Sequence, residues 1–476
     1  MRENQWLERD TVGYQTNGIQ RETIGMKQYS LVSGQASMAL LAQQMRRMKI
    51  WETIGQMVHI QQKTVQHSSL EKLQDAFLNI LSGGHGLVEI NTRVRPNRAL
   101  QVMFGRQACA EQSNVSRTLD RCTAENVQQM RRALLTLYVR HSRACQHDYR
   151  KGYQVLDIDF TGLLAGKQGE LVTKGYFSDH PHKRGRQVGR VLATRYAEIL
   201  SERLYAGSQQ LASGLQQLVT DAEVILNLQQ PQRQRTLLRI DGGGGQDADV
   251  NALLERDYCL LVKMFSGNRA RQLAQAVAEY EWISDPQRPD RDLAWLPQPV
   301  TYVRPTRQAA VRIRHKNQFY YGVLITNAPE RLLAELSDFS AYHPQADLLH
   351  LVYAYDHRSG GIETHNRGDK QGLGLSKRNK RSALAQEMLI LLAQLAHNLL
   401  IWFARCLKRH LPPKVHLGMQ RLIRDVLTIP GSLYFDHRAV LRALVLDPAH
   451  PFATAVFRAF HDQPVFPHIA LYLHKI

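Results

Sequence analysis

Apolar residues recur at helical spacing after Ser68, and Glu71 lies three residues further along the chain. This combination predicts a helix that begins with a capping box and ends at Gly83. Similar spacing continues to residue 150, so the pattern predicts a helical domain over residues 36–150. Residues 1–35 are polar and show no clear periodicity.

From Tyr153 onward the apolar residues form short runs typical of β-strands. Three of these runs alternate with helical patterns, which predicts an α/β core; they are YQVLDIDFTG (Tyr153–Gly162), TLLRID (Thr236–Asp241) and YCLLVKM (Tyr258–Met264). Residues 266–345 hold several prolines and further β-like runs, so we expect an all-β insertion there. A last strand is predicted at Asp347–Tyr355, before long C-terminal helices.

These changes of pattern divide the chain into six parts. They are a polar segment (1–35), a helical domain (36–150), the first part of an α/β domain (151–265), a β-rich insertion (266–345), the remainder of the α/β domain (346–410) and a C-terminal region (411–476).

Within the helical domain, residues 98–122 resemble a helix-turn-helix motif. One short helix is predicted at residues 99–104, and Ser113 or Asn114 can cap the next. In that arrangement Arg117 would face the major groove of DNA. An ordinary pair of packed helices fits the same residues.

The charge of the chain indicates a polyanionic partner. The sequence has 61 Lys and Arg against 42 Asp and Glu, a formal net charge of +19, and 43% hydrophobic residues. A disordered chain would have fewer apolar residues, and such an excess of cations favours nucleic acid or an anionic membrane surface.

The remaining composition favours nucleic acid and a cytoplasmic protein. The most apolar stretch, Leu384–Leu407, is interrupted by polar and charged residues, so we expect a buried helix and no membrane partner. The N-terminus is polar and does not resemble a signal peptide. The five cysteines form no CxxC pair, which argues against a zinc site and for a reducing compartment.

Two acidic motifs follow the predicted strands. Asp157 and Asp159 are two residues apart, so their side chains point to the same face of a strand. Asp241 ends the strand TLLRID, at the sheet edge where open α/β sheets place their sites, and four glycines follow it. Buried acids are costly unless they are paired or bind a metal. A turn or a helix cap is the alternative explanation for each acid alone.

A third charged motif lies in the segment Tyr355–Arg381. If a helix starts near Gly361, then Glu363, Arg367 and Lys370 lie on one face of it. One carboxylate beside two cations is either surface ion pairing or a metal ligand flanked by side chains that bind phosphate.

Together these motifs resemble bacterial insertion-sequence transposases of the DDE class. The resemblance rests on DIDFTG, KGYFSDHPHKRGRQVGRVLATRY, LLRIDGGGGQD and YDHRSGGIETHNRGDKQGLGL, in this order. The group it resembles has an RNase H-like catalytic core with a β-rich insertion before the catalytic Glu. A Tyr-Arg-Glu-Lys signature marks that group and maps here to Tyr355, Arg358, Glu363 and Lys370, with an Arg-to-Glu gap one residue longer than usual. The implied fold class is an α/β, RNase H-like core with an all-β insertion, preceded by a helical DNA-binding domain and followed by C-terminal helices.

The resemblance implies Asp159, Asp241 and Glu363 as catalytic residues and metal ligands. Asp157 is the alternative to Asp159, and the choice between them rests on Thr161, because Thr or Ser commonly follows the first Asp of the family by two residues. Three carboxylates can hold two Mg²⁺ ions, with Mn²⁺ as a substitute, and hard cations need no Cys or His.

Several other residues are predicted to contact DNA. Their charge and position suggest phosphate contacts for the basic residues after residue 182, which we expect in an exposed loop. The same holds for the cations of the predicted helix that starts near Gly361. Trp295 lies in the insertion, where a Trp of related transposases stacks on a flipped base; a core position is the alternative. The predicted contacts are Tyr355, Arg358, Arg367, Lys370, Lys183, Arg184, Arg186, Trp295 and Arg117.

The predicted function is a DNA transposase that binds the terminal repeats of its element, cuts there and joins the ends to target DNA. It would act as a dimer or synaptic complex on the nucleoid of a prokaryotic cytoplasm. The alternatives are a catalytically silent, transposon-derived DNA-binding protein and an RNase H-like nuclease without strand transfer.

Overall fold

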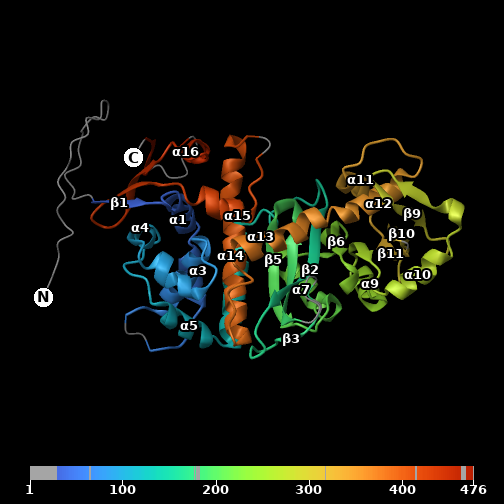
Figure 1. Ribbon diagram of the computed structural model, residues 1–476, viewed down its shortest axis with the longest axis horizontal. Helices are drawn as coiled ribbons and strands as arrows, with labels where there is room; N and C mark the ends of the chain where they lie inside the picture. The colour runs from blue at the N-terminus through green and yellow to red at the C-terminus, as the bar shows by residue number, and fades with distance from the viewer. Residues whose placement is uncertain are drawn as a thin grey trace.

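The computed structural model describes residues 29–63, 66–175, 177, 183–316, 318–412, 415–461 and 468–474. The protein is elongated, with a helical part at one end and a large sheet at the other (Figure 1). Most of the predicted polar segment, residues 1–28, lies outside the described residues.

A ten-stranded sheet forms the larger half of the molecule. Its order is β3-β4-β2-β6-β7-β11-β10-β9-β8, and β5 also pairs with β4. Strands β6 and β7 run parallel to β2, whereas the other pairs are antiparallel. The strands are β2 (Gln154–Leu164), β3 (Thr173–Lys174), β4 (Arg184–Ala193), β5 (Glu198–Ala206), β6 (Thr236–Ile240), β7 (Cys259–Lys263), β8 (Ile283–Asp285), β9 (Arg288–Trp295), β10 (Arg307–His315) and β11 (Gln318–Thr326).

Helices cover both faces of this sheet. Alternate residues of β2 and β6 contribute to two separate apolar clusters, as expected for a sheet buried on both sides. One cluster lies under α7 (Leu215–Leu226), α9 (Asp247–Glu255) and α10 (Gly267–Gln275), and α8 (Gln230–Arg233) lies beside it. The other lies under α11 (Glu330–Ser337) and α12 (Ala346–Asp356). Asp157 and Asp159 belong to the α12 face, because Val155, two residues before Asp157, is in that cluster.

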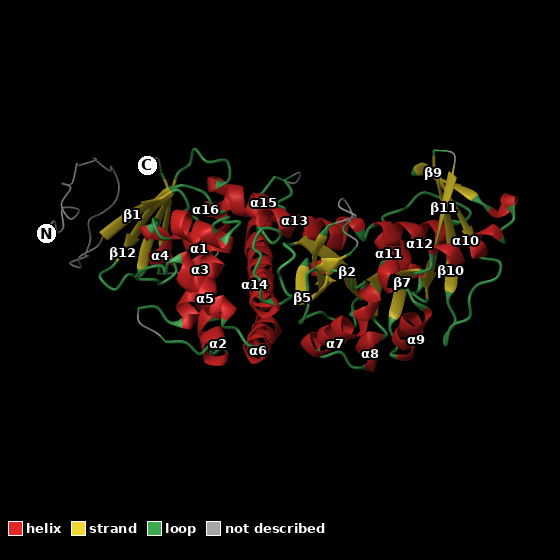
Figure 2. Ribbon diagram, turned by 60° about the horizontal axis from the view of Figure 1, so that its bottom comes forward, coloured by secondary structure: helices red, strands yellow, loops and turns green. Residues whose placement is uncertain are grey.

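The N-terminal and C-terminal parts of the chain share one apolar core. Its N-terminal helices are α1 (Met38–Arg47), α2 (Ile50–Met57), α3 (Ser69–Leu81), α4 (Arg98–Met103), α5 (Gln112–Asp120) and α6 (Ala124–His141). The long helix α14 (Ala383–Leu407) lies between these helices and the large sheet in both views (Figures 1 and 2). It packs against α3, α5 and α6 on one side and against β5 on the other.

Helix α14 is long and apolar enough to cross a membrane, with a mean hydropathy of 1.5 over its most apolar window. That window is 83% buried by the rest of the protein, however. The helix is therefore a core element, as the sequence predicted, and this is consistent with a soluble protein.

A second, four-stranded sheet joins the two ends of the chain. Its order is β1-β12-β13-β14, formed by β1 (Tyr29–Ser33), β12 (Gly431–Phe435), β13 (Leu441–Leu446) and β14 (Ala470–Leu473). It lies beside α1, α15 (Met419–Arg421) and α16 (Ala453–His461) (Figure 1). The C-terminal region thus belongs to the same body as the N-terminal helices.

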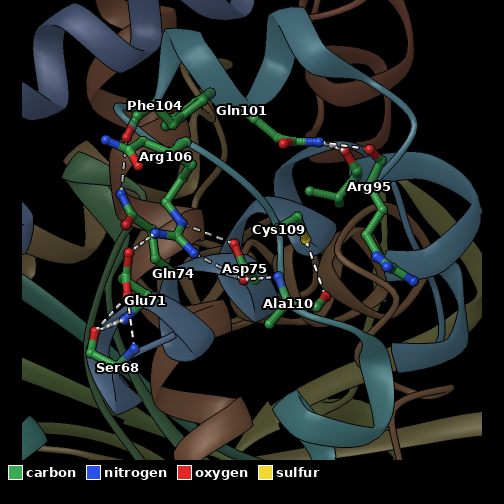
Figure 3. Close-up of polar contacts among 12 residues, drawn as sticks. Ser68, Glu71, Gln74, Asp75, Arg95, Gln101, Phe104, Arg106, Cys109 and Ala110 are labelled. Atoms are coloured by element: carbon green, nitrogen blue, oxygen red, sulfur yellow. Dashed lines mark hydrogen bonds and ion pairs between the residues drawn. The ribbon is translucent and has the colours of Figure 1, made fainter. Parts of the chain in front are cut away.

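The predicted capping box is confirmed, because Ser68 Oγ accepts from the Glu71 amide and Glu71 Oε2 accepts from the Ser68 amide. Glu71 also pairs with Arg106, whose guanidinium binds Asp75 (Nε–Oδ1 3.1 Å) (Figure 3). Arg106 lies in the connection between α4 and α5, residues 104–111. This connection is longer than the usual turn of about three to four residues in a helix-turn-helix, and Arg106 holds it against α3.

Two predictions of secondary structure are wrong. Residues Asp347–Tyr355 form helix α12, not a strand. The segment 266–345 is not all β, because it also contains α10 and α11, and its four strands β8–β11 continue the large sheet through the pairing of β11 with β7.

Candidate active site

Asp157 and Asp159 share one face of β2 but have different surroundings. The Asp157 side chain is 0% exposed and forms a two-pronged ion pair with Arg239 on the neighbouring strand β6 (Nε–Oδ1 2.6 Å, Nη2–Oδ2 2.9 Å). These residues lie opposite each other in the parallel register, and Arg239 also donates to the Ala354 carbonyl of α12. Asp157 is therefore occupied as the counter-charge of a buried arginine.

Asp159 has no such dedicated partner and is 16% exposed. Its Oδ1 lies 3.0 Å from Arg358 Nη2, and its Oδ2 accepts a hydrogen bond from Asn366 Nδ2 at 3.2 Å. Burial raises the pKa of Asp159 to about 6, and the nearby carboxylates of Asp241 and Glu363 add to the rise while Arg358 opposes it. This carboxylate lies among like charges, where an added cation would be stabilising.

Asp241 follows β6 at its carboxyl end. Its Oδ1 accepts the amide of Gly243 at 2.6 Å, which caps a short 3₁₀ turn formed by the glycines. The adjacent Gly245 is required, because a Cβ there would lie 1.9 Å from the carbonyl oxygen of Lys263. The glycine run thus folds tightly against β7 directly behind Asp241.

Glu363 reaches the other acids through an irregular turn between α12 and α13 (Thr364–Gly372). Residues Ser359–Glu363 form a π-helical turn with a kink at Gly361, where a Cβ would lie 2.6 Å from Asp157 Oδ2. A π turn accommodates one residue more than an α turn. Across this turn Arg358 Nη1 lies 3.0 Å from Glu363 Oε1.

Arg358 is buried between Asp159 and Glu363 and contacts both. Burial acts to lower its pKa, but the surrounding carboxylates, Asp159 foremost, outweigh this and the net shift is upward. The pKa of Tyr355 is also raised, but here burial itself causes the rise and the three carboxylates add to it. The structure therefore places Asp159, Asp241, Glu363, Tyr355 and Arg358 as electrostatic neighbours, and their roles in catalysis, metal binding and DNA binding stay predictions.

The two cations predicted to share a helix face with Glu363 lie further along α13. Arg367 is exposed, and Lys370 is half-buried one turn later. Asn366, which the sequence did not single out, points back to Asp159 from the same helix. Its position three residues after Glu363 was the available signal, since such residues share a helix face.

A buried charge network anchors α13 to the sheet. Asp369 binds Arg190 of β4 (2.7 Å) and His397 of α14 (2.8 Å), and Arg190 also binds Glu202 of β5 (2.6 Å). The two ring nitrogens of His397 lie near Asp369 Oδ1 and the Ala197 carbonyl (3.0 Å), so the ring is held between α13 and the segment before β5.

The carboxylates of Asp159, Asp241 and Glu363 suit a hard divalent cation, although they are not drawn together around one point. Among the described residues no three His, Cys, Asp or Glu side chains converge closely enough to hold a metal ion. Asp159 and Glu363 instead share the guanidinium of Arg358. Carboxylate oxygens are nonetheless the ligands that such ions prefer, and burial, with the nearby carboxylates of Asp241 and Glu363, raises the pKa of Asp159.

The basic segment after residue 182 differs from the prediction. It begins strand β4, and only Lys183 and Arg184 are exposed. Arg186 was expected to contact DNA, and this is wrong. Its side chain is buried and donates to the carbonyls of Glu170 (2.6 Å), Lys380 (2.8 Å) and Arg381 (2.8 Å).

The remaining predicted DNA contacts lie outside this cluster. Trp295 is half-buried against the apolar cluster of β9–β11 and α12, with the Arg307 guanidinium 5.8 Å from its ring centre. Arg117 is exposed on α5, next to Ser116, which accepts from Lys380 Nζ at 2.6 Å. The roles of Trp295 and Arg117 stay predictions.

Comparison with known proteins gives a matching family model and similar solved structures. A family model described as "Transposase DDE domain group 1" matches residues 28–445. Comparison with curated protein sequences finds no match. Among solved structures, a cryo-EM structure of a piggyBac transposase synaptic complex with hairpin DNA is similar, with 12% sequence identity and a TM-score of 0.42, over 82% of this chain and 79% of that chain.

Proposed function

The chain belongs to the transposase DDE domain family, group 1, and we propose that it is a DNA transposase that cuts the ends of its element and joins them to target DNA. The observation that carries this proposal is that Asp159 and Glu363 both pair with the buried guanidinium of Arg358, with Asp241 as a further electrostatic neighbour of it. The three acids come from separate segments of the chain, and several acids sharing one buried cation are typical of a functional site.

Within this proposal the core is RNase H-like. The sheet order β5-β4-β2-β6-β7, with three antiparallel strands followed by two parallel ones, supports that assignment. Asp159 is on the central strand and Asp241 follows its parallel neighbour, so both lie at one edge of the sheet.

The three carboxylates would hold divalent metal, with Mg²⁺ as the expected ion and Mn²⁺ as a substitute. The metal would activate the attacking oxygen and stabilise the leaving oxygen at the scissile phosphodiester. Arg358, buried and always charged, is placed to hold a phosphate oxygen once DNA competes for its guanidinium. Arg367 and Lys370 extend this cationic side along α13 toward the DNA backbone.

DNA is the proposed partner because the net charge of +19 favours a polyanion and the site carries chemistry for phosphodiesters. Two element ends must be handled together, so the active form is proposed to be a dimer or a larger synaptic complex on the nucleoid of a prokaryotic cell. A catalytically silent binding protein and a nuclease without strand transfer remain the alternatives to be separated by experiment.

The test uses the full chain, Mg²⁺ and a duplex that carries the terminal sequence of the element flanking the gene, with a plasmid as target. Wild type is expected to cut the end and to give joined products. Glu363→Gln, which keeps the size of the side chain and removes its charge, is expected to bind the duplex without cutting it.

Glu335→Gln is the matched control, because Glu335 is also about half exposed and paired with an arginine, Arg195. This variant should cut as wild type does. Cutting without joined products would indicate a nuclease, and binding without cutting by wild type, in Mg²⁺ or Mn²⁺, would indicate the silent protein.

A further inference from the structure

A small pocket adjoins the carboxylates on the side of the β10–β11 hairpin. Its volume is about 170 Å³, and an apolar floor of Val311, Ile313, Leu324 and Val352 is surrounded by Lys263, Arg288, Arg291, Tyr320, Tyr321, Tyr355 and Asp356. Tyr355 connects the pocket to the candidate active site, because it lines the pocket and is an electrostatic neighbour of all three acids.

Lys263 ends strand β7 next to Asp241. Ile240 of β6 lies opposite Val262 of β7, so Asp241 and Lys263 occupy the next positions of two adjacent parallel strands. Both lie on the sheet face that α12 covers, since Leu261, two residues before Lys263, belongs to that apolar cluster. Neighbouring strands are about 4.8 Å apart, so the distance between Lys263 and the acids is comparable to the spacing of one phosphate group from the next.

Two glycines make room for the stem of Lys263. A Cβ at Gly322 would lie 3.3 Å from Lys263 Cε, and a Cβ at Gly242 would lie 3.8 Å from its Cδ. The aliphatic stem therefore lies over Gly242 and Gly322, with the ammonium group beyond them at the pocket.

The charges around the pocket leave Lys263 as its available cation. Arg291 is buried and pairs with Asp285 (2.5 Å) and Asp356 (2.6 Å), so the carboxylate on the pocket wall is already compensated. Arg288 has Asp290 at 3.4 Å. Within the described part of the chain, Lys263 forms neither an ion pair nor a side-chain hydrogen bond, and it is exposed.

We propose that this pocket is a phosphate subsite, in which Lys263 binds the backbone phosphate of the nucleotide next to the scissile phosphodiester and the tyrosine-lined floor receives its sugar. An exposed ammonium without a partner, set beside a cluster of acids, suits a ligand that brings its own negative charge. The inference rests on the proposed function, because it assigns the ligand of a site adjoining the same carboxylates.

The test is a methylphosphonate scan of duplex binding. End-sequence duplexes, each with one neutral methylphosphonate near the cleavage position, are titrated in EDTA with full-length wild type, Lys263→Met, Lys263→Arg and the control Lys151→Met. Met keeps the stem that packs on the glycines, and Lys151 is an exposed lysine outside the pocket, paired with Asp148.

Wild type should bind several-fold more weakly when the methylphosphonate is at one position beside the cleavage site. At that position alone, the affinity of Lys263→Met should not change with the methylphosphonate. The slope of log Kd against log salt should fall by about one for Lys263→Met and be unchanged for Lys263→Arg and Lys151→Met. A Lys263→Met profile identical to that of wild type overturns the inference.

The inference and the proposed function fail in different ways. If wild type cuts the duplex with Mg²⁺ but Lys263→Met keeps the wild-type methylphosphonate profile, only the phosphate subsite is wrong. If wild type neither cuts the duplex nor shows any sensitive phosphate, both are wrong.

Discussion

At the residue scale, two aspartates on one strand face have opposite relations to the fold. Asp157 is the buried partner of Arg239, and Asp159 lies among other acids beside Arg358. The sequence placed both aspartates on one face of the strand. Only Thr161, two residues after Asp159, distinguished the two as candidates for the metal ligand. What separates them is Arg239, a cation inside the apolar strand TLLRID, whose partner only the strand register reveals.

The first prediction concerns stability. Asp157→Asn should lower the free energy of unfolding by about 3–5 kcal/mol, because it leaves Arg239 buried without its counter-charge. Asp159→Asn should cause no such loss. Urea denaturation of the two variants in EDTA measures both, and equal losses would contradict the different roles assigned here.

The second prediction concerns the pH dependence at Asp159. Its pKa is about 6 in the folded protein and about 3.9 when unfolded, so the folded state binds the proton more tightly. Ionisation of Asp159 therefore costs stability above pH ~4, and the cost is complete above pH ~6. Asp159→Asn should be more stable than wild type by about 3 kcal/mol at pH 8, with little advantage at pH 4. A difference independent of pH in metal-free buffer would argue against the raised pKa.

At the scale of elements, helix α13 begins directly after Glu363, carries Arg367 and Lys370, and is anchored to the sheet by Asp369. The sequence predicted one helix face with Glu363, Arg367 and Lys370, and it missed the anchor. Arg190 and Glu202 lie on separate strands and His397 on a distant helix, so no local spacing relates them to Asp369.

The third prediction follows from that anchor. The pKa of Asp369 is lowered, because His397 and Arg190 outweigh the opposing effect of burial, so its stabilising effect is present above pH ~4 and is lost as the pH falls below it. Asp369→Asn should cost about 3 kcal/mol at pH 7 and should slow DNA cleavage. Asp148→Asn, which breaks an exposed pair with Arg150, is the control and should cost less than about 1 kcal/mol. If the two variants have equal stability and cleave equally well, the anchor has no such role.

Two of the wrong predictions, the strand at Asp347–Tyr355 and the DNA contact of Arg186, arise from burial. Residues Asp347–Tyr355 are nearly continuous apolar residues, and a fully buried helix and a buried strand give the same pattern. Arg186 was expected in an exposed basic loop, whereas acceptors from other segments allow β4 to bury it. Composition cannot show such partners in advance.

At the scale of the whole molecule, the two ends of the chain are one structural unit. Strand β1 pairs with β12 over Tyr29–Ser33, and Leu31 packs against the core that the N-terminal helices share with α14. The sequence placed residues 1–35 in a separate polar segment, because a five-residue edge strand has too little pattern to be recognised.

The fourth prediction tests this union by truncation. A chain beginning at residue 36 lacks β1, so it exposes the edge of β12 and should melt on the order of 5 °C lower and self-associate. A chain beginning at residue 28 keeps the strand and is the control. Thermal melts with size-exclusion chromatography measure both properties, and identical behaviour of the two chains would show that β1 contributes nothing.

The central claim is that Asp159, Asp241 and Glu363 act as one metal-dependent unit that cuts DNA. The most direct measurement is single-turnover cleavage of the end duplex in Mg²⁺ by Asp159→Asn, Asp241→Asn, Glu363→Gln and the triple variant, with Asp157→Asn assayed at a temperature where it is folded. The account predicts that each single variant loses ~10³-fold or more in rate while still binding DNA, that the triple variant loses little more, and that Asp157→Asn still cuts. Near-normal cutting by any of the three single variants, or its loss in Asp157→Asn with retention in Asp159→Asn, would contradict it.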